Sequence, residues 1–151
     1  MKVFRKSLGL AFAGAALAAG ALATPAAAAD DQADVSSAVT FHTRGDGTQP
    51  PAHLGNPSEW GMVTITMDDS VRLVKPQTIV EVGGGTWSFG WNAVAGGKDC
   101  YSNYFHHAVG HSATVKIAGG SKRAWARANL TASAHLTGGG AYTCQAFWSK
   151  D

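Results

Sequence analysis

Hydrophobic and polar residues alternate most strictly over residues 86–92. Trp87, Phe89 and Trp91 occupy the odd positions, and small or polar residues separate them. Alternation with a period of two is typical of a β-strand that buries one face. The sequence therefore predicts a strand here, with its three aromatic rings in the core.

Other segments with this alternation, or with runs of β-branched residues, lie on both sides of that strand. We predict further strands over residues 60–67, 71–74, 78–82, 99–107, 112–118 and 141–148. Lys75 and Pro76 interrupt residues 71–82, and proline cannot donate a hydrogen bond to a sheet. An edge strand, or two short pieces, is expected there. In the last segment the residues expected to share one face are Tyr142, Cys144, Ala146 and Trp148.

Residues 122–135 allow two interpretations. Their alanine content favours a helix. However, the even positions are apolar from Ala124 to Ala134, while the odd positions are polar except for Trp125. Because this alternation lasts for fourteen residues, we favour one long strand over a helix.

Glycine-rich turns punctuate the predicted strands at intervals of about ten residues, which is typical of an all-β sandwich. We predict a small antiparallel β-sandwich domain over residues 60–151. Residues 41–60 contain many glycines and prolines, so we expect loop there and no core. Residues 30–59 as a whole are interpreted as a flexible Pro/Gly-rich lead-in.

The N-terminal segment resembles a secretory signal peptide. A basic start is followed by an apolar stretch rich in Ala and Leu, and small residues at 27–29 fit a cleavage site. We therefore predict that residues 1–29 are removed and that the protein is secreted. A membrane anchor is the alternative, although the apolar stretch is short for a membrane span.

Charge is unevenly distributed along the rest of the chain. Residues 30–81 hold 3 basic and 8 acidic side chains, whereas residues 82–151 hold 6 basic and 2 acidic ones. A basic C-terminal half suits an anionic partner, such as a bacterial surface lipid or polymer, but it is also compatible with ordinary variation of a soluble surface. No nucleic-acid-binding motif is present, so nucleic acid is not expected as a partner.

Two cysteines are present, Cys100 and Cys144. In an exported protein such a pair predicts a disulfide. Closing a loop of this length is expected to stabilise the fold by about 4 kcal/mol. We expect the bond to tie the second core strand to the last strand and to fix the register of a small sheet. A metal-binding or catalytic role is the weaker alternative.

Three histidines, His106, His107 and His111, lie close together in the sequence. Neighbouring residues of a strand point to opposite faces, so His106 and His107 cannot easily bind one metal, although His107 and His111 could converge across a turn. The sequence has no metal-ligand spacing, no CxxC and no GxSxG. We therefore expect polar residues that form hydrogen bonds at a strand end, with no metal, no cofactor and no enzymatic activity.

Aromatic residues are numerous for a domain of this size. Burial in the core explains most of them, above all the three rings of residues 86–92. Tyrosine near asparagine and histidine can also form a face for sugars or lipid headgroups. Tyr101, Asn103 and Tyr104 are the candidates for such a face.

Several motifs of the C-terminal half resemble the lactococcin 972 family of secreted bacteriocins. These are GGTW at residues 84–87 with Gly90 beyond it, YSNYFHH at 101–107, HSATV at 111–115, RAWARA at 123–128 and the terminal Phe147-Trp148. The resemblance covers residues 82–148 and extends to the N-terminal signal segment. Two features depart from the founding pattern of the family: the acidic segment 30–81 and the cysteine pair.

The resemblance implies an antiparallel β-sandwich, export and action on related bacteria. It further implies binding of the cell-wall precursor lipid II, inhibition of septum formation and a possible homodimer. Lys and Arg suit a pyrophosphate, and aromatic rings suit sugars. The predicted binding residues are Tyr101, Asn103, Tyr104, His107, His111, Arg123 and Arg127. The alternative function is a non-lethal secreted module that binds a cell surface or a partner protein.

Overall fold

A computed structural model describes residues 39–65 and 77–151. The predicted signal peptide (1–29), the predicted strand 71–74 and the last residues of the predicted strand 60–67 lie outside this described part. No helix within it is long and apolar enough to cross a membrane.

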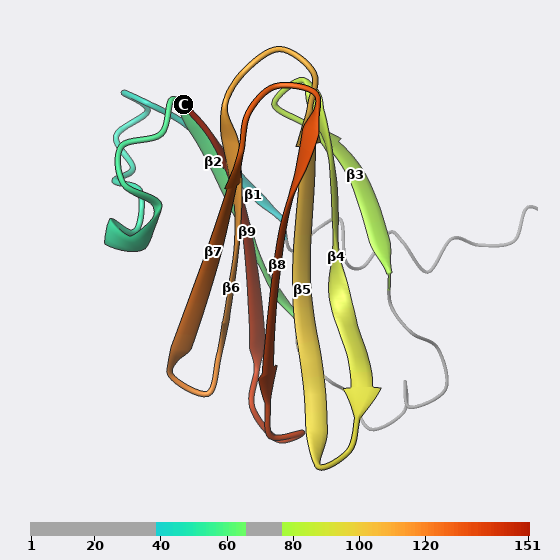
Figure 1. Ribbon diagram of the computed structural model, residues 1–151. Coiled ribbons are helices and arrows are strands. Elements are labelled where there is room, and N and C mark those ends of the chain that lie inside the picture. Colours follow the sequence, from blue (N-terminus) through green and yellow to red (C-terminus); the bar gives the residue numbers. More distant parts are fainter. Residues whose placement is uncertain (1–38, 66–76) are drawn as a thin grey trace, which may run out of the picture.

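Two antiparallel sheets face each other and form a sandwich (Figure 1). The five-stranded sheet has the order β1 (Thr40–Thr43), β2 (Glu59–Ile65), β9 (Cys144–Lys150), β6 (His111–Ile117) and β7 (Gly120–Ala126). The four-stranded sheet has the order β3 (Thr78–Val82), β4 (Gly85–Val94), β5 (Gly97–His106) and β8 (Leu130–Gly138). The predicted all-β class is confirmed, and β3 is an edge strand as expected.

The main core lies between the sheets and follows the predicted alternation. Trp87, Phe89 and Trp91 of β4 are all buried. A polar link crosses this core, because Nε1 of Trp87 donates to Oγ of Ser102 over 2.9 Å and this hydroxyl donates to the carbonyl oxygen of Phe147 over 2.8 Å. The link joins β4 and β5 of one sheet to β9 of the other.

The disulfide between Cys100 and Cys144 is present, with the two Cα atoms 6.0 Å apart. Cys100 belongs to β5 and Cys144 begins β9, so the bond joins the two sheets across the core. The expectation that it fixes the register within one sheet is therefore wrong. Tyr142, two residues earlier, is exposed and precedes the strand, so it does not share the buried face of Cys144.

The predicted single strand over residues 122–135 is also wrong. The chain leaves β7 after Ala126, turns at Ala128 and Asn129, and enters β8 in the opposite sheet. Asn129 has a φ of 64°, a left-handed conformation that asparagine tolerates well. Inward-facing alanines lie at even positions on both sides of the turn, at Ala126 and at Ala132. The turn therefore leaves no trace in the alternation.

A second, smaller core covers the outer face of the five-stranded sheet. The 44–58 segment, which includes the short 3₁₀ helix η1 (Ala52–Leu54), lies on the side of this sheet that faces away from the four-stranded sheet (Figure 1). Leu54 is only 1% exposed and packs with Trp60 and Phe147. The expectation of loop without core therefore fails here, and β1 adds a strand within the predicted lead-in.

Candidate functional site

The structure divides the seven predicted binding residues among three places. Tyr104 and His111 lie inside one end of the sandwich, with the exposed His107 beside them. Tyr101 and Asn103 lie on the outer side of β5. Arg123 lies on β7 at the edge of the other sheet, and Arg127 follows that strand directly. No single face can therefore contain them all.

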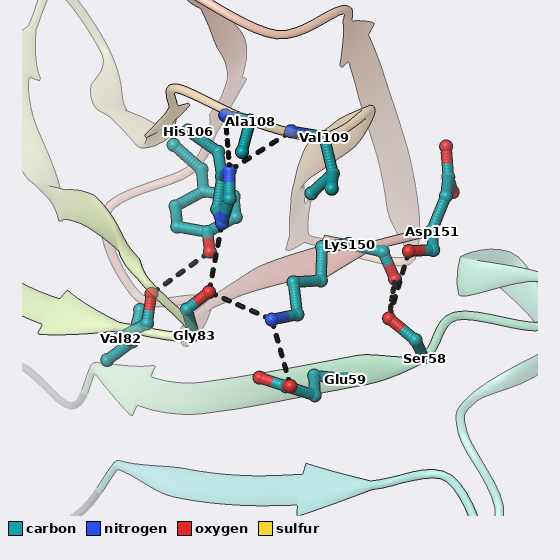
Figure 2. Close-up of polar contacts among 10 residues, drawn as sticks. Ser58, Glu59, Val82, Gly83, His106, Ala108, Val109, Lys150 and Asp151 are labelled. Carbon is teal, nitrogen blue, oxygen red and sulfur yellow. Dashed lines mark hydrogen bonds and ion pairs between the residues drawn. The ribbon is translucent and has the colours of Figure 1, made fainter.

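The end of the sandwich that contains Tyr104 and His111 is built around the glycine turn before β4 (Figure 2). We call it the closed end. Tyr104, which is 0% exposed, donates its hydroxyl to the carbonyl oxygen of Val82 over 3.0 Å. The carbonyl oxygen of Gly83 lies 3.0 Å from Nε2 of His106 and 3.0 Å from Nζ of Lys150. Burial raises the pKa of Tyr104 strongly. Tyr104 is thus buried and hydrogen-bonded within the protein, away from the exposed surface.

The hydrogen bonds of His106 define which of its two ring nitrogens carries the proton. The backbone N–H groups of Ala108 and Val109 donate to Nδ1 over 3.1 and 3.3 Å, so this nitrogen is the acceptor (Figure 2). Nε2 therefore carries the proton and donates to Gly83. Burial lowers the pKa of His106, and the positive charge of Lys150 lowers it further, against an opposing effect of the bond to Gly83.

His111 is fully buried and lies between two carbonyl oxygens. Nδ1 is 2.9 Å from the oxygen of Val109 and Nε2 is 2.9 Å from the oxygen of Leu130. His107 remains exposed, and its ring stacks on that of His106 at a centroid distance of 5.3 Å. The expected hydrogen-bonding histidines at a strand end are confirmed for His106 and His111. The described residues contain no cluster of three or more His, Cys, Asp or Glu side chains arranged to hold a metal ion.

The outer face of the four-stranded sheet carries polar residues around Tyr101. The Tyr101 ring stacks on His135 at a centroid distance of 5.8 Å, and Nδ1 of His135 lies 3.0 Å from Oδ2 of Asp99. Tyr101 is only 7% exposed, and burial raises its pKa. Oδ1 of Asn103 is buried and has no hydrogen-bond partner in the described part of the chain. Tyr101 itself therefore adds little exposed aromatic surface to this face, whereas Phe105, two residues beyond Asn103, is 38% exposed.

The edge strand β7 offers the most accessible set of candidate residues. Arg123 and Trp125 alternate to the same side of the strand, and Arg127 follows two residues later. All three side chains are exposed, and 60% of Trp125 is accessible to solvent. We name Arg123, Trp125 and Arg127 the β7 row.

The β7 row is positively charged. Nη2 of Arg123 donates to Oγ of Ser112 over 2.9 Å, and Nε1 of Trp125 donates to Oδ2 of Asp151 over 3.0 Å. Among residues 39–65 and 77–151, no carboxylate lies within ion-pair distance of either arginine. Within this part of the chain both arginine charges are therefore unpaired.

Further positive charge lies inward from the β7 row. Burial lowers the pKa of His53 in η1, and the charges of Lys116 and Arg123 lower it further. Lys116 and Arg123 therefore interact electrostatically with His53 over the outer face of β6 and β7.

Sequence reasoning missed two contributors to this region. The Arg-x-Trp-x-Arg spacing could have placed Trp125 with the arginines, since residues two apart on a strand share a face. His53 had no such signal, because it is 70 residues from Arg123 in the sequence and only tertiary packing brings them together.

Comparison with known proteins finds a family that matches part of the chain. Residues 83–148 match the profile of the family described as Bacteriocin (Lactococcin_972). Searches of curated proteins and of solved structures found no significant match. The matched segment begins at the glycine turn and ends at Trp148, so it contains Gly83, Tyr104 and His106 of the closed end and all of β7. This is a family of bacteriocins and not of enzymes, its members act on target bacteria, and the disulfide accords with an extracellular protein. Residues 83–148 of the chain are thus similar to the Lactococcin_972 bacteriocin family.

Proposed function

We propose that this protein is a secreted bacteriocin that binds the cell-wall precursor lipid II through the β7 row and thereby inhibits septum formation or growth of related bacteria. Lipid II presents a pyrophosphate between its sugars and its lipid at the membrane surface. A binding face therefore needs cations for the phosphates and amphipathic rings for the membrane interface.

The β7 row supplies both kinds of group. Guanidinium groups form paired, charge-assisted hydrogen bonds with phosphate oxygens. Tryptophan suits a boundary between apolar and wet surroundings, because its ring is apolar and its N–H is polar. The exposed Arg123 and Arg127, with no carboxylate partner among the described residues, are the single observation that carries the proposal.

An edge strand can also carry charges simply to prevent pairing with another sheet. Lys122 provides a matched control for that explanation. It is exposed on the same strand, but it alternates to the face opposite Arg123. A general charge effect would involve Lys122 as much as the arginines, whereas a binding face would not.

Binding to vesicles tests the proposal. The purified protein is mixed with neutral vesicles, with vesicles that contain lipid II and with vesicles that contain phosphatidylglycerol at equal charge. We expect selective binding to the lipid II vesicles. Equal binding to both anionic vesicles would reduce the interaction to charge alone and overturn the proposal.

A growth assay on related bacteria separates killing from recognition. We expect cells to stop dividing, with septa blocked. Selective binding without any effect on growth would instead support the alternative function, a non-lethal module that recognises the cell surface.

A further inference from the structure

Two buried polar atoms on the outer face of the five-stranded sheet have no hydrogen-bond partner in the part of the chain that the structure describes. They are Nε2 of His53 in η1 and Oγ1 of Thr114 in β6. Thr114 is fully buried. Because leaving a buried polar atom without a partner costs free energy, both atoms would be stabilised by a polar group bound between them.

The two atoms belong to one neighbourhood. Thr114 lies in register between Phe147 of β9 and Arg123 of β7. The ring of His53 packs edge-on against Phe147 at a centroid distance of 4.7 Å. On the other side, a β-carbon built on Gly55 would lie 3.7 Å from Nη1 of Arg123. His53 and Arg123 therefore flank Thr114, and the η1 segment spans the gap between them.

The neighbourhood is cationic. Lys116 and Arg123 both act on His53 through their charge. In the described residues no carboxylate forms an ion pair with either of them. Arg123 uses Nη2 for Ser112, so its other N–H groups remain available. A hydroxyl group and an imidazole nitrogen without partners, surrounded by positive charge, favour an anion over a cation or a neutral group.

We propose that His53, Thr114, Lys116 and Arg123 form a binding site for a phosphate-type oxyanion. Thr114 would donate its hydroxyl, His53 its Nε2–H and Arg123 its free N–H groups to the oxygens. A hollow of about 290 Å³, which Lys116 lines together with Thr143, Gln145 and the turn between β6 and β7, lies next to the site and leaves room for the group that carries the anion.

The site adds detail to the proposed function. Only the source of the anion rests on that proposed function. In lipid II the anion would be the pyrophosphate, held by Arg123 where the β7 row meets the η1 segment. A free phosphate or pyrophosphate presents the same chemistry, so the two sources are separated by experiment.

Binding of inorganic pyrophosphate tests the site without any lipid. The purified full chain is titrated at pH 6.5 and low ionic strength, by calorimetry and by NMR of the histidine ring protons. We expect saturable binding and a shift of the His53 signals. Since a hydrogen bond to a charged group is involved, Thr114→Val and His53→Gln should each weaken binding by about tenfold. Lys122→Ala should leave it unchanged.

Thr114→Val also separates ligand binding from a purely structural role. Replacing an unpaired buried hydroxyl by a methyl group of similar shape is expected to preserve or raise the melting temperature. Weaker pyrophosphate binding with an unchanged or higher melting temperature would therefore support the site. Absence of pyrophosphate binding by the folded wild type, or equal binding by Thr114→Val, would overturn it.

Lipid II vesicles complete the test. If pyrophosphate binds at the site but lipid II vesicles are not bound selectively, the anion site stands with a soluble ligand and the proposed function fails. If lipid II vesicles are bound selectively and Thr114→Val binds them as well as the wild type does, the proposed function stands and the site is overturned.

Discussion

Nζ of Lys150 lies 3.0 Å from the carbonyl oxygen of Gly83, although 67 residues separate the two in the sequence. Lys150 also pairs with Oε1 of Glu59 over 2.8 Å, and His106 shares the Gly83 oxygen (Figure 2). One carbonyl group therefore connects the turn before β4 to strands β2, β5 and β9. The motif residues around this turn hold the closed end of the sandwich together.

Acid is expected to destabilise this end through His106. Its pKa is lowered in the folded state from the ordinary value of 6.5, so the unfolded chain takes up the proton more readily. The contribution of neutral His106 is thus complete above about pH 6.5 and is lost as the pH falls through the lower pKa of the folded state. Urea unfolding between pH 7.5 and 4.5 measures this loss.

His106→Asn provides the matched variant, because an amide oxygen can still accept from the N–H of Ala108 but does not titrate. His53, whose pKa is also lowered, remains in both proteins and contributes equally. The variant should therefore lose less stability on acidification than the wild type. Identical pH profiles would contradict the role of His106.

Removing the disulfide should cost about 4 kcal/mol of unfolding free energy, because Cys100 and Cys144 close a loop across a separation of 44 residues. Denaturant unfolding of Cys100→Ser/Cys144→Ser measures the loss, and the reduced wild type should behave like the double variant. Two free thiols in the untreated protein by mass spectrometry would show that the bond does not form.

Leu54→Ala tests the second core. Leu54 is buried between Trp60 and Phe147, so the truncation should lower the unfolding free energy by about 2–5 kcal/mol. Phe41→Ala is the control, since Phe41 is 55% exposed and its truncation should cost far less. Equal losses in the two variants would mean that the η1 segment does not stabilise the sheet beneath it.

Gly83→Ala tests the glycine turn. Gly83 has a φ of 57°, and a β-carbon there would lie 2.6 Å from Cζ3 of Trp148. Overpacking of this kind should reduce stability by about 1–3 kcal/mol. Gly45→Ala, at a φ of 95° with open space around it, carries the backbone strain without the clash. A loss no greater than that of Gly45→Ala would exclude the clash with Trp148.

The sequence pattern predicted those elements that depend only on their own residues and near neighbours in the chain. The alternation of Trp87, Phe89 and Trp91 marks β4 because each ring meets the same core. Pro76, which precedes β3 in the sequence, predicts an edge strand because proline cannot donate a hydrogen bond to a sheet. Cys100 had only Cys144 as an intramolecular partner. None of these conclusions requires knowledge of the opposite sheet.

Features decided by contacts between distant segments could not be predicted. Ala126 and Ala132 are both buried at even positions, before and after the turn at Asn129. The alternation of apolar and polar residues therefore does not show that the chain passes from one sheet to the other there. Alternation separates Tyr101 from Tyr104, but which of the two is buried in the core depends on where the second sheet lies. The approach of His53 to Arg123 depends on how the η1 segment folds over β6 and β7.

The most direct test of the β7 row compares lipid II binding by three variants. Arg123→Ala/Arg127→Ala, Lys122→Ala and the wild type are titrated with vesicles with and without lipid II, after circular dichroism has verified their fold. We predict that the double variant loses at least about tenfold in lipid II-dependent affinity, because each arginine can make charge-assisted bonds to phosphate, while Lys122→Ala binds like the wild type. Unchanged binding by the double variant, or an equal loss in Lys122→Ala, would contradict the assignment of lipid II binding to the β7 row.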